Sequence, residues 1–205
     1  TSRGCPYECT FCANSVRKVR YRPVEQVVDE LEYLKANHDI ESFYVQDDTF
    51  AIEKERVYKF LDELQARDLD LIWAAETRVN LVDREMLKAM REAGCVQLDF
   101  GVESGSQAAL DRMRKGITVE QIRETFAACH ELGIRTYANW MYNTPGETKE
   151  DVQLTFALIK DLNSTVGGSQ LCMPLLGTKI YEDYVHPQLT IDEYRLFERP
   201  DLYST

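Results

Sequence analysis

Three cysteines near the start of the chain are the residues whose types and spacing most directly suggest chemistry. Cys5, Cys9 and Cys12 follow a Cys-x3-Cys-x2-Cys pattern, and an aromatic residue, Phe11, precedes the third cysteine. Thiolates this close in sequence can ligate a soft metal ion or an iron–sulfur cluster. The next cysteine, Cys95, lies far along the chain. Three thiolates would therefore leave one iron of a four-iron cluster open to bind a small molecule.

Two other interpretations of the triplet stay open at this point. One is a zinc-stabilised binding module, although structural zinc prefers four closed ligands and the chain offers one Cys-x2-Cys pair with one extra cysteine. The other is a non-catalytic iron–sulfur electron carrier, which would commonly supply a fourth cysteine. A disulfide framework fits poorly, because 205 residues can bury a core unaided and the six cysteines are unevenly spread.

The composition is ordinary for a single globular domain, with 44% hydrophobic and 29% charged residues. No apolar run approaches the length of a membrane span and no signal peptide is evident, so we expect no membrane association and a cytoplasmic protein. The net charge of −11 argues against general nucleic-acid binding. Arg17, Lys18, Arg20 and Arg22 nevertheless form a local basic run, which is either solvated or receives an anionic substrate or partner.

The rest of the chain alternates the helices and strands that must position the cysteines. Sequence signals predict helices that begin at Pro23, Asp83 and Thr148 and a helix around 119–132. A further amphipathic helix is marked by Val57, Phe60, Leu61 and Leu64. Between them lie predicted strands at 42–48, 71–78, 95–103, 135–143 and 170–175. Such repeats predict an α/β fold, a partial (β/α)6 TIM-like barrel of parallel strands whose first strand, residues 1–4, is truncated or very short. We expect residues 1–185 to form this core and residues 186–205 to be a C-terminal extension that starts a further region.

The predicted strand 95–103 indicates where a site would lie. Its odd and even positions differ: Val96, Leu98, Phe100 and Val102 alternate with Gln97, Asp99, Gly101 and Glu103. The apolar face should meet the helices, and the polar face should line a ligand cavity inside the barrel. Active sites of such barrels lie at the carboxyl ends of the strands, where polar residues gather at 47–49, 76–78, 103–105 and 139–143.

The cysteine pattern with its aromatic residue resembles the signature of the radical S-adenosylmethionine (SAM) superfamily. The resemblance implies that Cys5, Cys9 and Cys12 hold a [4Fe-4S] cluster whose fourth iron binds the amino and carboxylate groups of SAM. It implies reductive cleavage of SAM to a 5′-deoxyadenosyl radical, which abstracts hydrogen from an unknown substrate. An electron donor such as flavodoxin or ferredoxin is the implied partner, and the implied fold is the same partial barrel.

The strand-end motifs resemble the segments that contact SAM in this family. Residues 47–50 lie where the family meets the SAM amino group, and residues 101–106 resemble its ribose-contacting segment. Arg78 could pair with the SAM carboxylate, because a guanidinium binds a carboxylate bidentately, or could instead form a salt bridge to Glu76 or Glu103. The SAM-binding residues expected from the resemblance are Phe11, Asp47, Asp48, Arg78, Glu103, Ser104, Asn139 and Met141.

Together with a Pro-Gly-Glu-Thr turn at 145–148, these motifs are most similar to cobalamin-binding radical SAM proteins. The turn also occurs in methylthiotransferases, so cobalamin-dependent methyl transfer and methylthiotransfer are alternatives within the family. Such proteins usually place a cobalamin domain before the barrel. This chain has none and begins close to the cysteines, so we expect an upstream domain outside it. No catalytic acid or base stands out; Cys172 is a candidate hydrogen donor or methyl acceptor, whereas Cys95 and Cys129 are expected in the core.

Overall fold

The computed structural model describes residues 1–13 and 16–185, so the expected extension at 186–205 lies outside the described residues. In the described part, five parallel strands pair in the order β3-β4-β5-β6-β7. They are β3 (Ser42–Val45), β4 (Ile72–Thr77), β5 (Cys95–Glu103), β6 (Arg135–Tyr142) and β7 (Val166–Leu171). The sheet does not close, since β3 and β7 are its outer strands. This architecture confirms the predicted α/β partial barrel of parallel strands.

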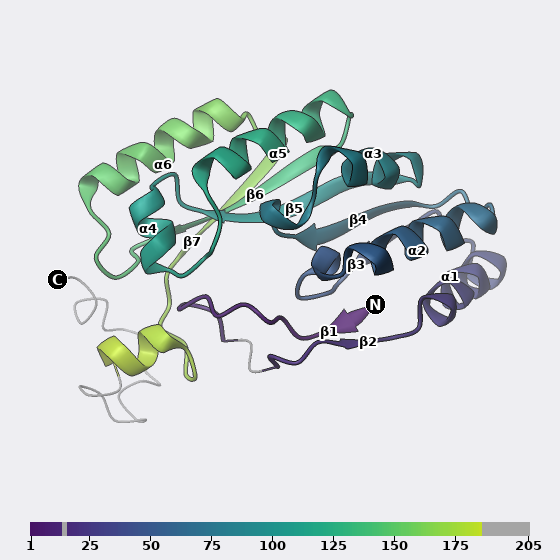
Figure 1. Cartoon of the computed structure of the whole chain (residues 1–205), viewed down its shortest axis with the longest axis horizontal. Helices are drawn as coiled ribbons and strands as arrows, with labels where there is room; N and C mark the ends of the chain where they lie inside the picture. The colour runs from purple at the N-terminus through teal and green to yellow at the C-terminus, as the bar shows by residue number, and fades with distance from the viewer. Residues whose placement is uncertain (14–15, 186–205) are drawn as a thin grey trace.

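Helices alternate with these strands and pack against the sheet (Figure 1). They are α1 (Val24–His38), α2 (Lys54–Ala66), α3 (Arg84–Glu92), α4 (Gln107–Arg112), α5 (Val119–Glu131) and α6 (Lys149–Leu162). Short helical turns are η1 (Phe50–Ile52), η2 (Val79–Leu81) and η3 (Tyr181–Val185). None of the helices in residues 1–13 and 16–185 combines the length and apolar character needed to cross a membrane.

Local side chains start α3, α4, α5 and α6, and for α3, α5 and α6 the sequence predicts the same start. The Asp83 carboxylate accepts a hydrogen bond from Met86 N at the start of α3, and Ser106 accepts one from Ala109 N at the start of α4. Thr118 and Thr148 each form a reciprocal capping box before α5 and α6. These caps satisfy N–H groups that the helices leave without partners.

The first predicted strand does not join the parallel sheet. Instead β1 (Ser2–Arg3) pairs antiparallel with β2 (Arg20–Tyr21) in a separate two-stranded ribbon. The carboxylate of Asp47 attaches this ribbon to the end of β3, because it accepts hydrogen bonds from Ser2 N at 2.8 Å and Ser2 Oγ at 2.7 Å. The chain therefore enters and leaves the segment that carries the three cysteines through the two paired strands of this ribbon.

The last strand begins four residues earlier than the predicted strand at 170–175. The sequence does not predict the start of β7 because it contains Gly167 and Gly168, and glycine has low strand propensity. A Cβ on Gly168 would lie 2.2 Å from the Tyr137 hydroxyl of the neighbouring strand β6, so glycine at 168 leaves room for the Tyr137 side chain. The apolar residues from Cys172 onward, which suggested the strand, follow its end.

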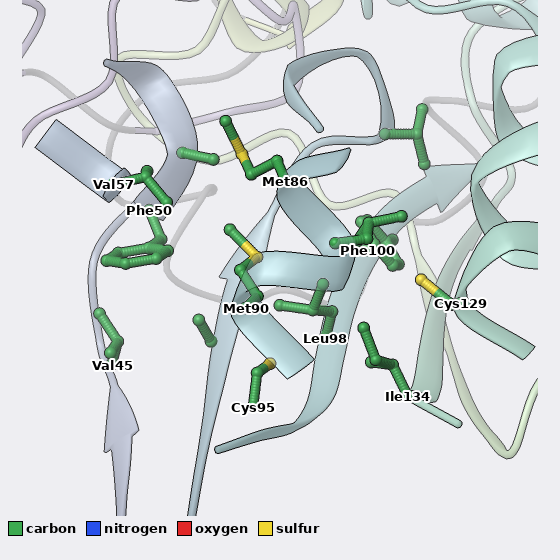
Figure 2. Packing of buried hydrophobic residues seen from close by; sticks show 14 of the residues in the cluster. Val45, Phe50, Val57, Met86, Met90, Cys95, Leu98, Phe100, Cys129 and Ile134 are labelled. Atoms are coloured by element: carbon green, nitrogen blue, oxygen red, sulfur yellow. The ribbon is translucent and has the colours of Figure 1, made fainter. Parts of the chain in front are cut away.

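One hydrophobic cluster fills the space between the sheet and the helices (Figure 2). Leu98 and Phe100 of β5 are fully buried there, as the predicted alternation requires, and Met90 of α3 packs in the same cluster. Cys95 and Cys129 are also fully buried, and this burial raises the pKa of each thiol to about 12. The two cysteines are therefore core residues, as the sequence predicts. Since Leu98 and Phe100 face the core, the site must lie on the opposite face of β5.

Candidate functional site

A cavity of about 470 Å³ lies where the carboxyl ends of the strands meet the cysteine loop, defined here as residues 4–13. Gly101 and Glu103 of β5 line this cavity, which confirms that the polar face of the strand looks inward. The cavity also brings together most of the predicted site residues from distant parts of the chain. Those that line it are Cys5, Cys9, Phe11, Cys12, Asp48, Arg78, Glu103, Asn139 and Met141.

Backbone hydrogen bonds hold the cysteine loop in place. Thr10 N donates to Met113 O at 3.0 Å, and Thr10 O accepts from Ile180 N at 3.1 Å. Nearer its start, Cys5 N donates to Val16 O at 3.0 Å. The loop is therefore fixed by the end of α4, by the segment containing Ile180 and by the segment that precedes β2.

The three thiols of the loop provide a donor set suited to an iron–sulfur cluster. All six cysteines lie in the described residues, and none forms a disulfide. Among the described residues, no three His, Cys, Asp or Glu side chains converge as they would on a single metal ion. A four-iron cluster gives each thiolate its own iron, so its ligands need not meet at one point. Three soft thiols around one cavity therefore fit a cluster better than they fit one zinc ion.

Arg78 lies beside the buried Cys9. Its Nη1 atom is 3.7 Å from Cys9 Sγ, and its guanidinium stacks 3.9 Å from the ring centroid of Tyr7. The side chain is largely buried, and its Nη2 donates to the carbonyl oxygen of Lys115. The salt bridge to Glu76 or Glu103, considered as an alternative from the sequence, is wrong: within the described residues, Glu103 pairs with Lys115 and Arg78 contacts no carboxylate.

Glu103 and Lys115 form a buried ion pair in the cavity wall. Lys115 Nζ lies 2.7 Å from Glu103 Oε1, and each side chain is only 8% exposed. Glu103 has a φ of +66°, a left-handed conformation that costs energy in a residue with a side chain, and the β5–β6 register shifts beside it. A Cβ on Gly101 would lie 2.5 Å from Glu103 Oε1 and 2.6 Å from Lys115 Nζ. Glycine at 101 is therefore what makes room for the pair.

Lys115 is the site residue that the sequence interpretation missed. Its ammonium also lies 5.6 Å from the Phe11 ring centroid, so it links the cysteine loop to the end of β5. The residue is 12 positions after Glu103, beyond the short helix α4. The sequence offered one indication of this contact: the segment between Glu103 and Lys115 is short, so it keeps Lys115 near the end of β5.

Acidic groups from neighbouring strands form another part of this wall. Glu76 lines the cavity, and its pKa is raised by burial and by the nearby Asp99, with Lys115 acting in the opposite direction. Asp99 accepts a hydrogen bond from Tyr44 OH at 2.8 Å, and burial together with this bond raises the pKa of Tyr44. The cavity thus has the Arg78 guanidinium near Cys9 and the acidic groups Glu76 and Glu103 at the ends of β4 and β5.

Three predicted site residues do not line the cavity. Asp47 turns away to hold Ser2; burial raises its pKa, but the hydrogen bonds it accepts outweigh this and leave the pKa lowered. Ser104 Oγ is 3.1 Å from Thr155 Oγ1 and accepts from Ser106 N, which shapes the turn between β5 and α4. Cys172 is buried, and burial with the nearby Glu147 and Glu103 raises its pKa to about 11.

The chain belongs to the radical SAM superfamily, because the sequence model of that superfamily matches residues 1–159. Enzymes of this family bind a [4Fe-4S] cluster and SAM and need an electron donor. Membership therefore sets aside the zinc module and the non-catalytic electron carrier as classes. The fold is the family's partial barrel.

The curated relatives include two proteins that are at least 31% identical to this chain over most of its length. The chain is 33% identical over 185 residues to an uncharacterized methyltransferase, PH0819, of Pyrococcus horikoshii, covering 89% of this chain and 40% of the relative. It is 31% identical to an anaerobic magnesium-protoporphyrin IX monomethyl ester cyclase of Rubrivivax gelatinosus, covering 89% of this chain and 34% of the relative.

Among solved structures, the radical SAM methyltransferase TsrM from Kitasatospora setae, described with cobalamin and a [4Fe-4S] cluster bound, matches with a TM-score of 0.80 and 25% identity. This match covers 88% of the present chain and 35% of TsrM. The chain thus spans well under half the length of these relatives.

Proposed function

We propose that this chain is the catalytic core of a radical SAM enzyme, with residues 1–185 as the core and Cys5, Cys9 and Cys12 as the cluster ligands. When bound, the reduced cluster and SAM supply a 5′-deoxyadenosyl radical that abstracts hydrogen from the substrate. The observation that carries this proposal is the common cavity: the three cysteines line the same space as Arg78, Glu103 and Lys115.

The charges of the cavity match those of SAM. SAM carries a carboxylate, an ammonium and a sulfonium group. Arg78 and Lys115, the cations beside Cys9 and Phe11, are suited to bind the carboxylate. Glu76 and Asp48 are suited to the cationic groups, and Glu103 to the ribose hydroxyls. Asn139, Phe11 and Met141 would complete contacts to the nucleoside.

Asp47 and Ser104 have indirect roles in this proposal. Asp47 would hold the β1–β2 ribbon, and with it the start of the cysteine loop, through its bonds to Ser2. Ser104 would keep the turn after Glu103 in place through Thr155. Both residues position other groups rather than touch SAM.

The β6–β7 side of the cavity is less charged and is where a substrate would bind. Trp140, Met141, Leu171, Met173 and Leu175 line it. Together with a bound substrate, these apolar side chains would exclude water from the space next to the cysteines and so protect a reactive radical from side reactions.

Cobalamin-dependent methyl transfer is a second candidate. It is supported by the relatives, since the P. horikoshii protein is named a methyltransferase and the matched TsrM structure is described with cobalamin. In this case the cavity would again bind SAM.

Anaerobic reconstitution tests the proposal. The full chain is loaded with iron and sulfide, reduced with dithionite and mixed with SAM, and 5′-deoxyadenosine is measured. We expect about four irons per chain and formation of 5′-deoxyadenosine. Cys9→Ala should lose both, whereas Cys129→Ala, which removes a buried core thiol, should retain both. A fully loaded cluster that cleaves no SAM would contradict the radical reaction.

The products separate the two candidates. With cobalamin added, methyl transfer converts SAM to S-adenosylhomocysteine, whereas hydrogen abstraction yields 5′-deoxyadenosine and methionine. S-adenosylhomocysteine that appears only with cobalamin would favour the methyltransferase.

A further inference from the structure

We propose that the β1–β2 ribbon and the segment leading into it form the docking surface for an acidic electron-donor protein. We call this surface the basic ribbon and define it by Arg3, Arg17, Lys18, Arg20 and Arg22. The inference rests on the proposed function, because a cluster on the cysteine loop must receive single electrons from outside.

The basic ribbon is a positive region on a negatively charged chain. Residues 1–22 hold five basic residues and one acidic residue, whereas the remaining residues hold 19 basic and 34 acidic residues. All five basic side chains are exposed. An exposed patch of one sign attracts a partner of the opposite sign and speeds its association.

The pairing of β1 with β2 places like charges opposite each other. Arg3 and Arg20 are direct cross-strand partners in the antiparallel register. Like charges in this relationship destabilise a sheet. Within residues 1–13 and 16–185, no carboxylate lies at ion-pair distance from Arg3, Lys18 or Arg20, and of the five only Arg22 has such a partner, Glu30 at 2.7 Å. The repulsion is thus not relieved internally, and an acidic partner would relieve it.

The basic ribbon lies directly against the cysteine loop. Val16 O accepts the hydrogen bond from Cys5 N, and Arg17 donates to the carbonyl oxygen of Tyr7. Gly4, one residue before Cys5, is so close to this segment that a Cβ there would lie 2.8 Å from Val16 O and 3.0 Å from Lys18 O. A partner bound to the ribbon therefore reaches the outer side of the cysteine loop.

A second cavity lies beside the basic ribbon and shares one wall residue with the site cavity. It measures about 620 Å³ and is lined by Arg3, Arg20, Tyr21 and Arg22, with Asp48 in its wall. Asp48 also lines the site cavity, so the two cavities lie on either side of one residue. A donor on this surface would lie near the cysteines without entering the β6–β7 side that we assign to the substrate.

The partner is therefore a small acidic protein that carries a reduced flavin or iron–sulfur group. The transfer itself is simple: the donor loses one electron, the cluster on this chain gains it, and no bond forms or breaks. Nucleic acid would also favour a basic surface, but it carries no electron and meets the strongly negative remainder of the chain.

Charge-reversal variants of the full chain test this surface. The ribbon variant is Arg3→Glu with Arg20→Glu; the control is Lys88→Glu with Arg123→Glu on α3 and α5, across the sheet from the ribbon (Figure 1). Both variants make the same change in net charge. Binding to a reduced flavodoxin and, separately, to a reduced ferredoxin is measured by calorimetry at low and at physiological salt. We expect the ribbon variant to bind at least about tenfold more weakly at low salt and to lose most of its salt dependence, and the control to change less than about twofold.

The single variant Arg3→Glu separates docking from folding. It replaces the Arg3–Arg20 repulsion with an opposite-charge pair, so its thermal unfolding midpoint should rise or stay unchanged while donor binding weakens. SAM cleavage driven by dithionite, which needs no docking protein, should remain at the unmodified level in both ribbon variants.

The outcomes distinguish the two proposals. Failure of dithionite to drive SAM cleavage in the unmodified chain would contradict the proposed function. Normal dithionite-driven cleavage with equal donor binding by the ribbon and control variants would overturn only the docking surface. The docking proposal would also be overturned if a short RNA bound the chain and lost affinity in the ribbon variant while neither donor bound.

Discussion

Lys115 Nζ lies 2.7 Å from Glu103 Oε1, and the two side chains are almost completely buried where the end of β5 meets the loop after α4. The carboxylate is carried by a residue with left-handed backbone, and the ammonium also faces the ring of Phe11. The pair therefore joins a strand end, a loop and the cysteine loop in one wall of the cavity.

Removing one partner of this buried ion pair should lower the stability of the fold. Lys115→Met would leave the Glu103 carboxylate buried without its cation and should lower the free energy of unfolding by about 3 kcal/mol. The double variant Lys115→Met with Glu103→Gln should recover much of this loss, because neither charge then remains unpaired. Urea unfolding of the chain measures all the members of this double-mutant cycle. Additive effects of the two single substitutions would show that the groups do not interact.

Gly101→Ala should damage the site more than the fold. Its Cβ would press on the ends of two side chains, Glu103 and Lys115, which can move only by disturbing the cavity wall. We expect SAM to bind about tenfold more weakly, a loss of about 1.4 kcal/mol, with a small change in the unfolding midpoint.

Gly167→Ala on β7 is the matched control for this substitution, because its nearest neighbour, Ala138 O, would be 3.4 Å from the new Cβ. Equilibrium dialysis with labelled SAM measures both variants. Equal affinities in the two would show that the space at 101 is not needed.

Acid should weaken the attachment of α4 to α6 through Asp151. Burial raises its pKa, but hydrogen bonds from Ser106 Oγ, Thr148 N and Arg112 Nη2 outweigh this and lower the pKa to about 2. An unfolded Asp has a pKa of about 3.9. The stabilising contribution of Asp151 is therefore complete above about pH 4 and is lost as pH falls through about 2.

The variant Asp151→Asn isolates this contribution. Between about pH 5 and 7, above the pKa of an unfolded Asp, the variant should have a lower free energy of unfolding than the unmodified chain by a constant amount. This difference should shrink as pH falls toward about 2. Urea titrations at a series of pH values give this difference directly. A deficit that grows on acidification would contradict the assigned direction.

The candidate thiol Cys172 provides a test of a sequence-based hypothesis. The thiol is buried, is absent from the lining of the site cavity and has a pKa raised to about 11. We expect Cys172→Ala to retain its 5′-deoxyadenosine yield within about twofold, a change in barrier of under 1 kcal/mol. Chromatography of the nucleoside products measures it, with Cys9→Ala as the inactive reference. A large loss with an intact cluster would restore Cys172 as a catalytic residue.

Features that depend on local sequence were predictable. The spacing of Cys5, Cys9 and Cys12 identifies the ligand set because it is a property of one short segment. The caps at Asp83 and Thr148 act over three residues, and the alternation along β5 follows from the period of a strand.

Contacts between residues that are distant in sequence, and the directions in which adjacent side chains point, were not predictable. Asp47 and Asp48 are neighbours in sequence, yet the backbone at the end of β3 directs Asp47 to Ser2 and leaves Asp48 at the cavity. The pairing of Glu103 with Lys115 depends on where α4 ends. The start of β7 was not predicted because Gly167 and Gly168 have low strand propensity, and the Tyr137 side chain for which Gly168 leaves room belongs to a strand distant in sequence.

The two backbone hydrogen bonds of Thr10 have a consequence for the biosynthesis of the protein. One partner is Met113 and the other is Ile180, so a nascent chain that has just exposed its cysteines has neither anchor. The cysteine loop takes its final shape only after the segment containing Ile180 has left the ribosome. A truncation before Ile180 would therefore remove one of the two backbone anchors of Thr10 and should leave the cysteine loop less well fixed.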